Sequence, residues 1–133
     1  MKLCWLNPTQ LDEADFALLC KGGVPGGWKP LQVAEKLLSG AWLAFRCDGG
    51  AFAVEKAGDR LYVTCLCIER FGWRLRAFRD VMDRLAADLG CNTVETTVFD
   101  ERLAQAMVRI RARPESWNMV WQVEGRQQHG HED

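Results

Sequence analysis

Residues 63–78, VTCLCIERFGWRLRAF, join an alternating apolar stretch to a stretch of helical period, with Gly72 at the junction. Apolar side chains at every second position up to Glu69 are typical of a strand, and apolar residues at helical spacing from Trp73 onwards predict a helix. The first turn of a helix has free backbone amides and the positive end of the helix dipole. The junction is therefore a candidate anion site, or simply a strand that turns into a helix.

The helix after this junction is rich in arginine. Residues 70–84 carry five positive and two negative charges, and such a helix start can bind a phosphate. The same charges also fit a solvated helix face on which Arg76 pairs with Asp80 and Arg79 with Asp83. Nucleic acid is not favoured, because no aromatic residues alternate with basic ones on a predicted sheet surface. The five arginines are Arg70, Arg74, Arg76, Arg79 and Arg84.

The whole chain predicts one α+β domain. The apolar period changes from helical to two at residue 41 and back at residue 73. Three strands at hairpin spacing followed by a crossover helix give a mixed, mainly antiparallel central sheet with helices on both faces, an α/β sandwich. We expect a single domain over residues 1–125 and a mobile polar tail over residues 126–133. The expected strands are 2–6, 41–47, 51–56, 60–69, 92–99 and 116–124, and the expected helices are 7–23, 29–40, 73–89 and 100–112.

Composition narrows the class of protein. The chain has 133 residues and a net charge of −1, so its overall charge does not attract nucleic acid or an anionic membrane. No apolar run approaches the roughly 20 residues that span a bilayer, and residues 1–10 lack the apolar core of a signal peptide, so we expect a cytoplasmic protein that is not secreted. Cys65 and Cys67 would share one face of a regular strand, but the only histidines, His129 and His131, lie in the tail. We therefore expect no metal, and cysteines that are buried free thiols.

Residues 41–111 resemble the GNAT superfamily of acyl-CoA N-acyltransferases. The resemblance rests on the order of the elements and on the interval from Gly72 to Gly90, which matches the interval from the family's phosphate-loop glycines to the glycine that closes the same helix. It implies that acetyl-CoA or another acyl-CoA binds at the fourth strand and the helix after it. The implied contacts are the backbone of Leu66, Cys67, Ile68 and Glu69 along the pantetheine arm, and Gly72, Trp73 and Arg74 at the pyrophosphate.

Two departures from the family pattern affect this implied site. The family places an Arg or Gln three residues before the first glycine and a second small residue two positions after it, whereas this chain has Glu69 and Arg74 there. Arg74 either pairs with the phosphates or blocks the close backbone approach that small residues allow. Many family members use a tyrosine to protonate the departing thiolate. The nearest positions here are Met107 and Val108, and the only tyrosine is Tyr62.

An N-acyltransferase also needs a general base, or a water path to one, near the fourth and fifth strands. Glu69 is the first candidate for this catalytic role, ahead of Glu55 and Glu95. Each has a structural alternative, since Glu69 could be the N-terminal acid of the helix and the other two could face solvent. Cys67 could accept an acyl group, although the favoured role is that of a small apolar neighbour on a strand.

Three functions remain. The first is an acyl-CoA-dependent N-acetyltransferase with a degenerate CoA motif, acting on a small amine or a protein acceptor. The second is a catalytically inactive GNAT-shaped protein with a structural or binding role, and the pattern also resembles short proteins encoded by tailed bacteriophages, some of them virion-associated. The third is a sensor that binds CoA or a nucleotide without turnover. The second function predicts a homo-oligomer or a structural partner.

Overall fold

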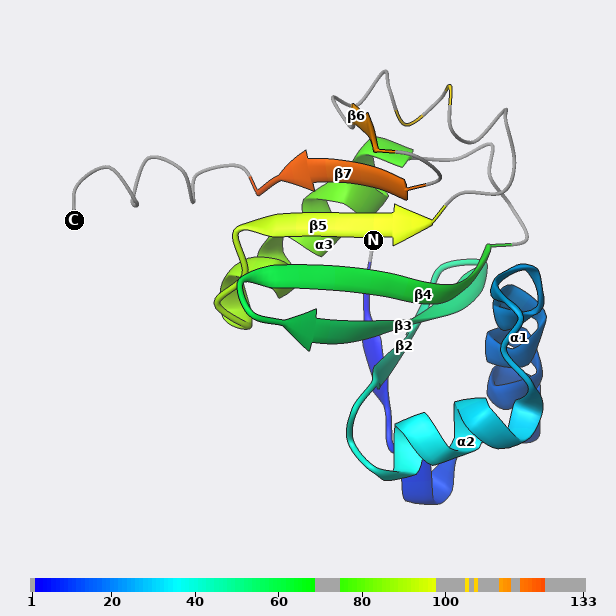
Figure 1. The fold of residues 1–133 in the computed structure, drawn as a ribbon. Helices are drawn as coiled ribbons and strands as arrows, with labels where there is room; N and C mark the ends of the chain where they lie inside the picture. The colour runs from blue at the N-terminus through cyan, green and yellow to red at the C-terminus, as the bar shows by residue number, and fades with distance from the viewer. Residues whose placement is uncertain are drawn as a thin grey trace. The chain divides into compact units, whose positions relative to one another are not determined.

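The computed structural model describes residues 2–68, 75–97, 105, 107, 113–115 and 118–123. Within these residues the strands form an open mixed sheet in the order β1-β2-β3-β4-β5-β7-β6, accompanied by three α-helices (Figure 1). The expected α+β class with a mixed, mainly antiparallel sheet is confirmed. None of the helices in the described segments has the length and hydropathy needed to cross a membrane.

The elements follow the expected order closely. The strands are β1 (Cys4–Leu6), β2 (Leu43–Cys47), β3 (Gly50–Ala57), β4 (Arg60–Ile68), β5 (Thr93–Thr97), β6 (Arg113–Glu115) and β7 (Asn118–Gln122). The α-helices are α1 (Glu13–Gly23), α2 (Pro30–Leu38) and α3 (Leu75–Asp88), and two short 3-10 helices are η1 (Pro8–Gln10) and η2 (Val24–Gly26). Gln105 and Met107 are helical, as expected for the fourth helix, whose other residues lie outside the described part.

The first compact unit comprises Met1–Glu55 and Val63–Trp73. Its strands β1, β2 and β3 are antiparallel, with Phe45 of β2 opposite Trp5 of β1 and Phe52 of β3. The rings of Phe45 and Phe52 stack with their centroids 5.7 Å apart. A buried cluster joins the helices of this unit to its strands, and it consists of Leu6, Leu19, Val33, Leu37, Trp42, Ala44, Ala51, Ala53 and Cys65.

The first long helix begins later than the sequence predicts. We expected it to start near Pro8, but Pro8 opens a separate 3-10 turn that Asn7 caps. The α-helix starts only after Asp12, whose carboxylate accepts a hydrogen bond of 2.8 Å from the amide of Ala14. An aspartate at this position satisfies one of the free amides of the first turn, which explains where the helix begins.

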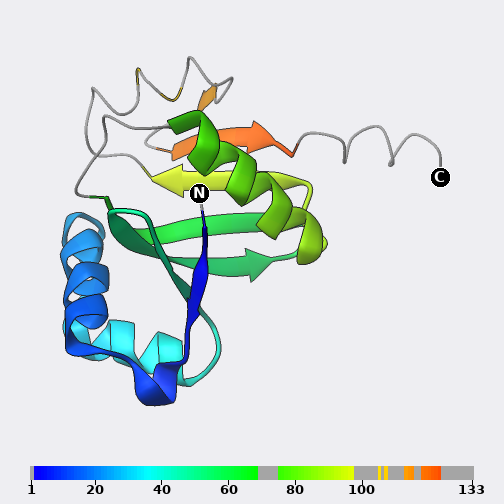
Figure 2. The same ribbon diagram turned by 180° about the vertical axis from the view of Figure 1, so that it is seen from behind.

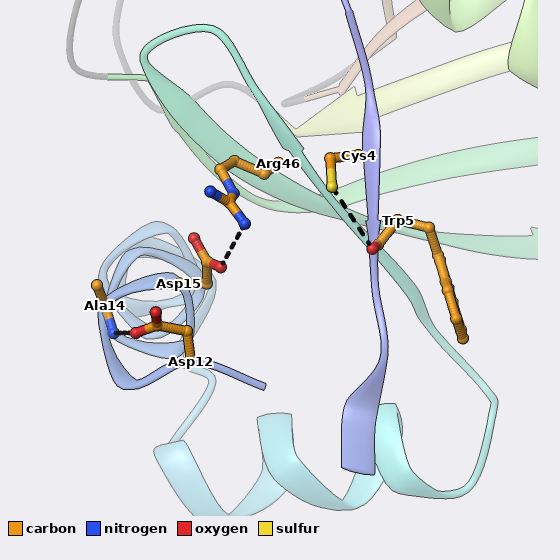
Figure 3. A network of polar contacts seen from close by, with 6 residues as sticks. All are labelled: Cys4, Trp5, Asp12, Ala14, Asp15 and Arg46. Carbon is orange, nitrogen blue, oxygen red and sulfur yellow. Dashed lines mark hydrogen bonds and ion pairs between the residues drawn. The ribbon is translucent and has the colours of Figure 1, made fainter. Parts of the chain in front are cut away.

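An ion pair ties α1 to β2. The carboxylate of Asp15 on α1 is buried and lies 3.3 Å from the guanidinium of Arg46, which is largely exposed (Figure 3). An acidic residue in the first turn of α1, where it interacts favourably with the helix dipole, therefore also makes a tertiary contact. α2 begins at Pro30 as expected, because proline is tolerated in the first turn of a helix.

The second compact unit comprises Lys56–Tyr62 and Arg74–Asp133. In it, β7 pairs antiparallel with β5 and with the short strand β6, which the sequence did not predict. α3 lies across β5 and β7 (Figure 2), and the left-handed Gly90 that follows it, with φ of 78°, confirms the expected C-terminal glycine. The buried apolar residues of α3 are Phe78, Val81, Met82 and Ala86.

Candidate functional site

The predicted cofactor segment lies at the end of β4. Leu66 is half-buried there, and the next two residues, Cys67 and Ile68, are buried. The structure therefore describes the strand half of the predicted site. The other predicted site residues lie outside the described part of the chain: Glu69, Gly72, Trp73 and Arg74.

β4 departs from regular strand geometry just before this segment. Cys65 has φ of 52° and is the one non-glycine residue with positive φ in the described part of the chain. This left-handed conformation costs such a residue about 1–2 kcal/mol and is typical of a bulged strand. Burial nevertheless alternates through Cys65 as far as Cys67, and the alternation ends only at Ile68, which is also buried. Cys65 and Cys67 are both buried, as expected for residues on one face, although the left-handed Cys65 departs from the regular strand that this expectation assumed.

A close contact with β3 sets the direction of the backbone in this segment. A Cβ added at Gly50 would collide with the carbonyl oxygen of Cys67 and lie 2.8 Å from Cα of Ile68. The carbonyl of Cys67 therefore faces β3. Because backbone groups of successive strand residues point to opposite sides, those of Leu66 and Ile68 are directed away from β3. β5 is the next strand on that side of β4, and groups directed there can hydrogen-bond to an extended ligand wherever β5 does not pair with them.

The cysteines are free thiols, and four of them are buried: Cys47, Cys65, Cys67 and Cys91. Burial raises the pKa of Cys65 to about 11, and burial together with the charge of Asp48 raises the pKa of Cys47 to about 11. A thiol reacts as its thiolate, so both should be poor nucleophiles at neutral pH. The exposed Cys4 and half-buried Cys20 do not confirm the expectation that the cysteines are buried.

We expect alkylation of the native protein at pH 8 to modify Cys47 and Cys65 about a hundredfold more slowly than an ordinary thiol, because their pKa of about 11 lies two units above the reference value of 9.0. Iodoacetamide labelling followed by peptide mass spectrometry measures this, with urea-unfolded protein as the control.

The raised pKa also means that the folded state holds these protons more tightly. Their contribution to stability is therefore complete below pH 9 and is lost as the pH rises through 11. Rapid labelling of Cys65 in the folded protein would contradict the raised pKa of this thiol.

Two of the three candidate bases are described. Glu95 is buried on β5 and its carboxylate accepts a hydrogen bond of 2.7 Å from the guanidinium of Arg60. This contact gives the carboxylate of Glu95 a structural partner, and the solvent-facing alternative for Glu95 is wrong. Glu55 is half-buried near the end of β3. Met107, one of the two positions compared with the family's tyrosine, is fully buried.

The arginine-rich helix is only partly a solvated face. Arg76 and Arg84 are exposed, as expected. Arg79 and Asp83 are buried, so their placement on a solvated face is wrong, although their pairing is confirmed by a separation of 3.6 Å between Nε and Oδ2. Sequence reasoning missed their third partner. The indole Nε1 of Trp121 donates a hydrogen bond of 2.8 Å to Oδ1 of Asp83.

Two apolar hollows lie elsewhere in the first unit, beside α2. Their volumes are about 200 Å³ and 230 Å³, and both are lined by Pro8, Leu37 and Leu38. Trp5 lines the smaller hollow and is 54% exposed. Neither hollow is lined by a residue of β4, so they are separate from the segment at Leu66.

The fold is shared with several solved acyltransferases. A protein of Klebsiella pneumoniae subsp. pneumoniae MGH 78578 that is assigned as an acyl-CoA N-acyltransferase has a similar structure. The match covers 92% of this chain and 97% of that protein's chain, with a TM-score of 0.62 and 15% identity. The N-acetyltransferase PseH of Campylobacter jejuni matches 90% and 97%, with a TM-score of 0.60 and 14% identity. The PaiA N-acetyltransferase of Thermoplasma acidophilum, in complex with coenzyme A, matches 90% and 97%, with a TM-score of 0.54 and 7% identity.

These similarities are structural rather than sequential. No family model and no curated protein matches the sequence. The chain therefore has the GNAT acyl-CoA N-acyltransferase fold, as the order of its elements predicted. A fold by itself does not define an activity, so the function has to be argued from the site.

Proposed function

We propose that this chain binds an acyl-CoA along the end of β4 and transfers the acyl group to an amine, in the cytoplasm. One observation carries the proposal. Cys65 has a left-handed conformation within β4, and the backbone groups of Leu66 and Ile68 beyond it are directed away from β3. A pantetheine arm is an extended chain with two amides, and it can pair with such a strand as another strand would. The coenzyme A complex of the Thermoplasma protein, which shares the fold, supports this choice of ligand.

The proposed roles divide between strand and helix. A bound acyl-CoA supplies a thioester carbonyl that an amine can attack. Leu66 and Ile68 hold the arm through their backbone groups, and amides at residues 72–74 hold the pyrophosphate. Glu69 accepts the proton that the attacking amine loses. The acceptor is a small molecule or a protein side chain that carries an amine.

A second function, binding without catalysis, is favoured by two of the described residues, Met107 and Glu95. Met107 is fully buried and has no proton to give to a leaving thiolate. Glu95 is already engaged by Arg60. A protein of this kind would act as a CoA sensor, or as a structural component such as one associated with a phage virion. The structural version predicts self-assembly or a stable partner, which light scattering detects.

Titration with acetyl-CoA separates these functions. At 100 times its dissociation constant, a ligand that binds only the folded state raises the unfolding free energy by about 2.7 kcal/mol, so thermal unfolding should move to higher temperature. Release of free thiol from acetyl-CoA after adding amines then measures turnover. Inorganic pyrophosphate at the same concentration is the control for general anion binding.

Each outcome of this titration has a defined meaning. A thermal shift with thiol release supports the transferase. A shift without thiol release from a broad set of amines supports binding without catalysis. No shift up to millimolar acetyl-CoA excludes both CoA-dependent functions and leaves the structural role.

A further inference from the structure

The last turn of α1 lies directly against the left-handed residue of β4. The nearest atoms to a Cβ added at Gly22 would be the carbonyl oxygen and carbon of Cys65 and the carbonyl carbon of Leu66, the last at 2.8 Å. All three are backbone atoms, and the first would be a collision. No side chain larger than hydrogen fits between helix and strand at this point.

The side chain of Cys65 is held by the same helix turn. Its sulfur lies 3.1 Å from the position that a Cβ at Gly23 would take. The thiol is 3% exposed and belongs to the buried cluster that includes Leu19 of α1. The carbonyl and the thiol of Cys65 therefore both lie against the end of α1, at Gly22 and Gly23.

A cysteine does not adopt positive φ without support from its surroundings, since the extended conformation of a strand is favoured for it. The contacts with the last turn of α1 provide such support. If the helix turn moved away, Cys65 could relax toward extended geometry. Such a change would rotate the peptide that leads into Leu66 and so redirect the groups that follow.

We propose that Gly22 is a positioning residue. It allows the last turn of α1 to pack against the Cys65–Leu66 peptide, and this contact fixes the direction of the backbone groups of Leu66 and Ile68 for the ligand. The role in ligand binding rests on the proposed function, whereas the effect on the strand does not. Gly22 itself touches no ligand in this proposal. It acts through Cys65.

The test compares a glycine in the last turn of α1 with one just beyond the helix. Gly22→Ala forces the helix end to retreat from the peptide, so we expect shifted amide resonances for Leu66 and Ile68 in the ligand-free protein. Coenzyme A, measured by calorimetry, should bind about tenfold more weakly or worse, as expected for a misplaced binding group. Gly26→Ala is the control, because its Cβ would meet only ring atoms of Trp28, the nearest at 3.2 Å, and no atom of Cys65. It should leave both measurements close to those of the unmodified protein.

A double variant distinguishes positioning from general damage. Glycine adopts positive φ freely, so Gly22→Ala combined with Cys65→Gly should keep the strand conformation without the support of the helix. We expect the resonances of Ile68 and the coenzyme A affinity to return toward their original values. If Gly22→Ala alone does not fold, folding of the double variant supports the proposal, and its failure to fold overturns it.

The remaining outcomes are also decisive. Unchanged resonances of Leu66 and Ile68 in Gly22→Ala overturn the proposal, whatever the protein binds. Equal shifts in Gly22→Ala and Gly26→Ala overturn it as well, because the effect would then be one of general packing. If the unmodified protein does not bind coenzyme A, the proposed function fails, while the resonances still decide whether Gly22 positions the strand.

Discussion

Asp83→Ala should lower the unfolding free energy by about 3–5 kcal/mol, because it removes one partner of a buried ion pair. Asp83 accepts a hydrogen bond of 2.8 Å from Trp121 and lies 3.6 Å from Nε of Arg79. Both partners are themselves buried, at 2% and 7% exposure, so the substitution leaves a desolvated guanidinium and a desolvated indole N–H. Arg79 retains its contact of 3.3 Å with the carbonyl of Gln122, which does not neutralise its charge.

Urea unfolding followed by tryptophan fluorescence measures this loss. Asp80→Ala is the matched control, since Asp80 is an exposed acid on the same helix, and its replacement should change stability by less than about 0.5 kcal/mol. Asp83→Asn adds a second comparison, because it keeps an oxygen for the Trp121 hydrogen bond and removes only the charge. A loss below about 1 kcal/mol for Asp83→Ala would show that the buried contacts contribute little.

This network marks a limit of reading helices from sequence. The helical spacing of apolar residues correctly predicted the helix itself, and the four-residue spacing correctly predicted that Arg79 pairs with Asp83. The pair was wrongly placed in solvent, because charged residues are normally exposed unless they are paired with a buried partner. That partner, Trp121, comes 38 residues later in the chain. The spacing of apolar residues shows which face of a helix is apolar, but not which residue of a distant strand contacts the charged residues at the edge of that face.

The candidate site, too, could be predicted from the sequence only in part. Its location at the end of β4 followed from the alternation of apolar residues and from the order of the elements, and the fold confirms that order. The left-handed Cys65 could not be predicted, because positive φ is usually found at glycine or asparagine and a cysteine gives no such signal. The residue that could have indicated this geometry is Gly22. Its position in the sequence predicted only the end of a helix, whereas it also allows a backbone contact that no other residue permits.

Gly50 is the other glycine in close backbone contact with β4, and Gly50→Ala should lower the unfolding free energy by about 3 kcal/mol or more. Its added Cβ would collide with the carbonyl oxygen of Cys67 and lie 2.8 Å from Cα of Ile68. Neither atom can rotate away as a side chain could, so β3 and β4 must move apart. Gly50 is also fixed on its other side, because it pairs with Cys47 of β2.

The control for this prediction is Gly26→Ala, where a Cβ would meet only ring atoms of Trp28, the nearest at 3.2 Å. Gly50 and Gly26 both lack positive φ, so alanine is compatible with the backbone at each position, and the contact with β4 exists at Gly50 but not at Gly26. At a compatible site, alanine stabilises a protein by about 0.4–1 kcal/mol through the unfolded state, so Gly26→Ala should be neutral or slightly stabilising. Equal stability of the two variants in urea would mean that β3 and β4 are not in the close contact on which the direction of Leu66 and Ile68 depends.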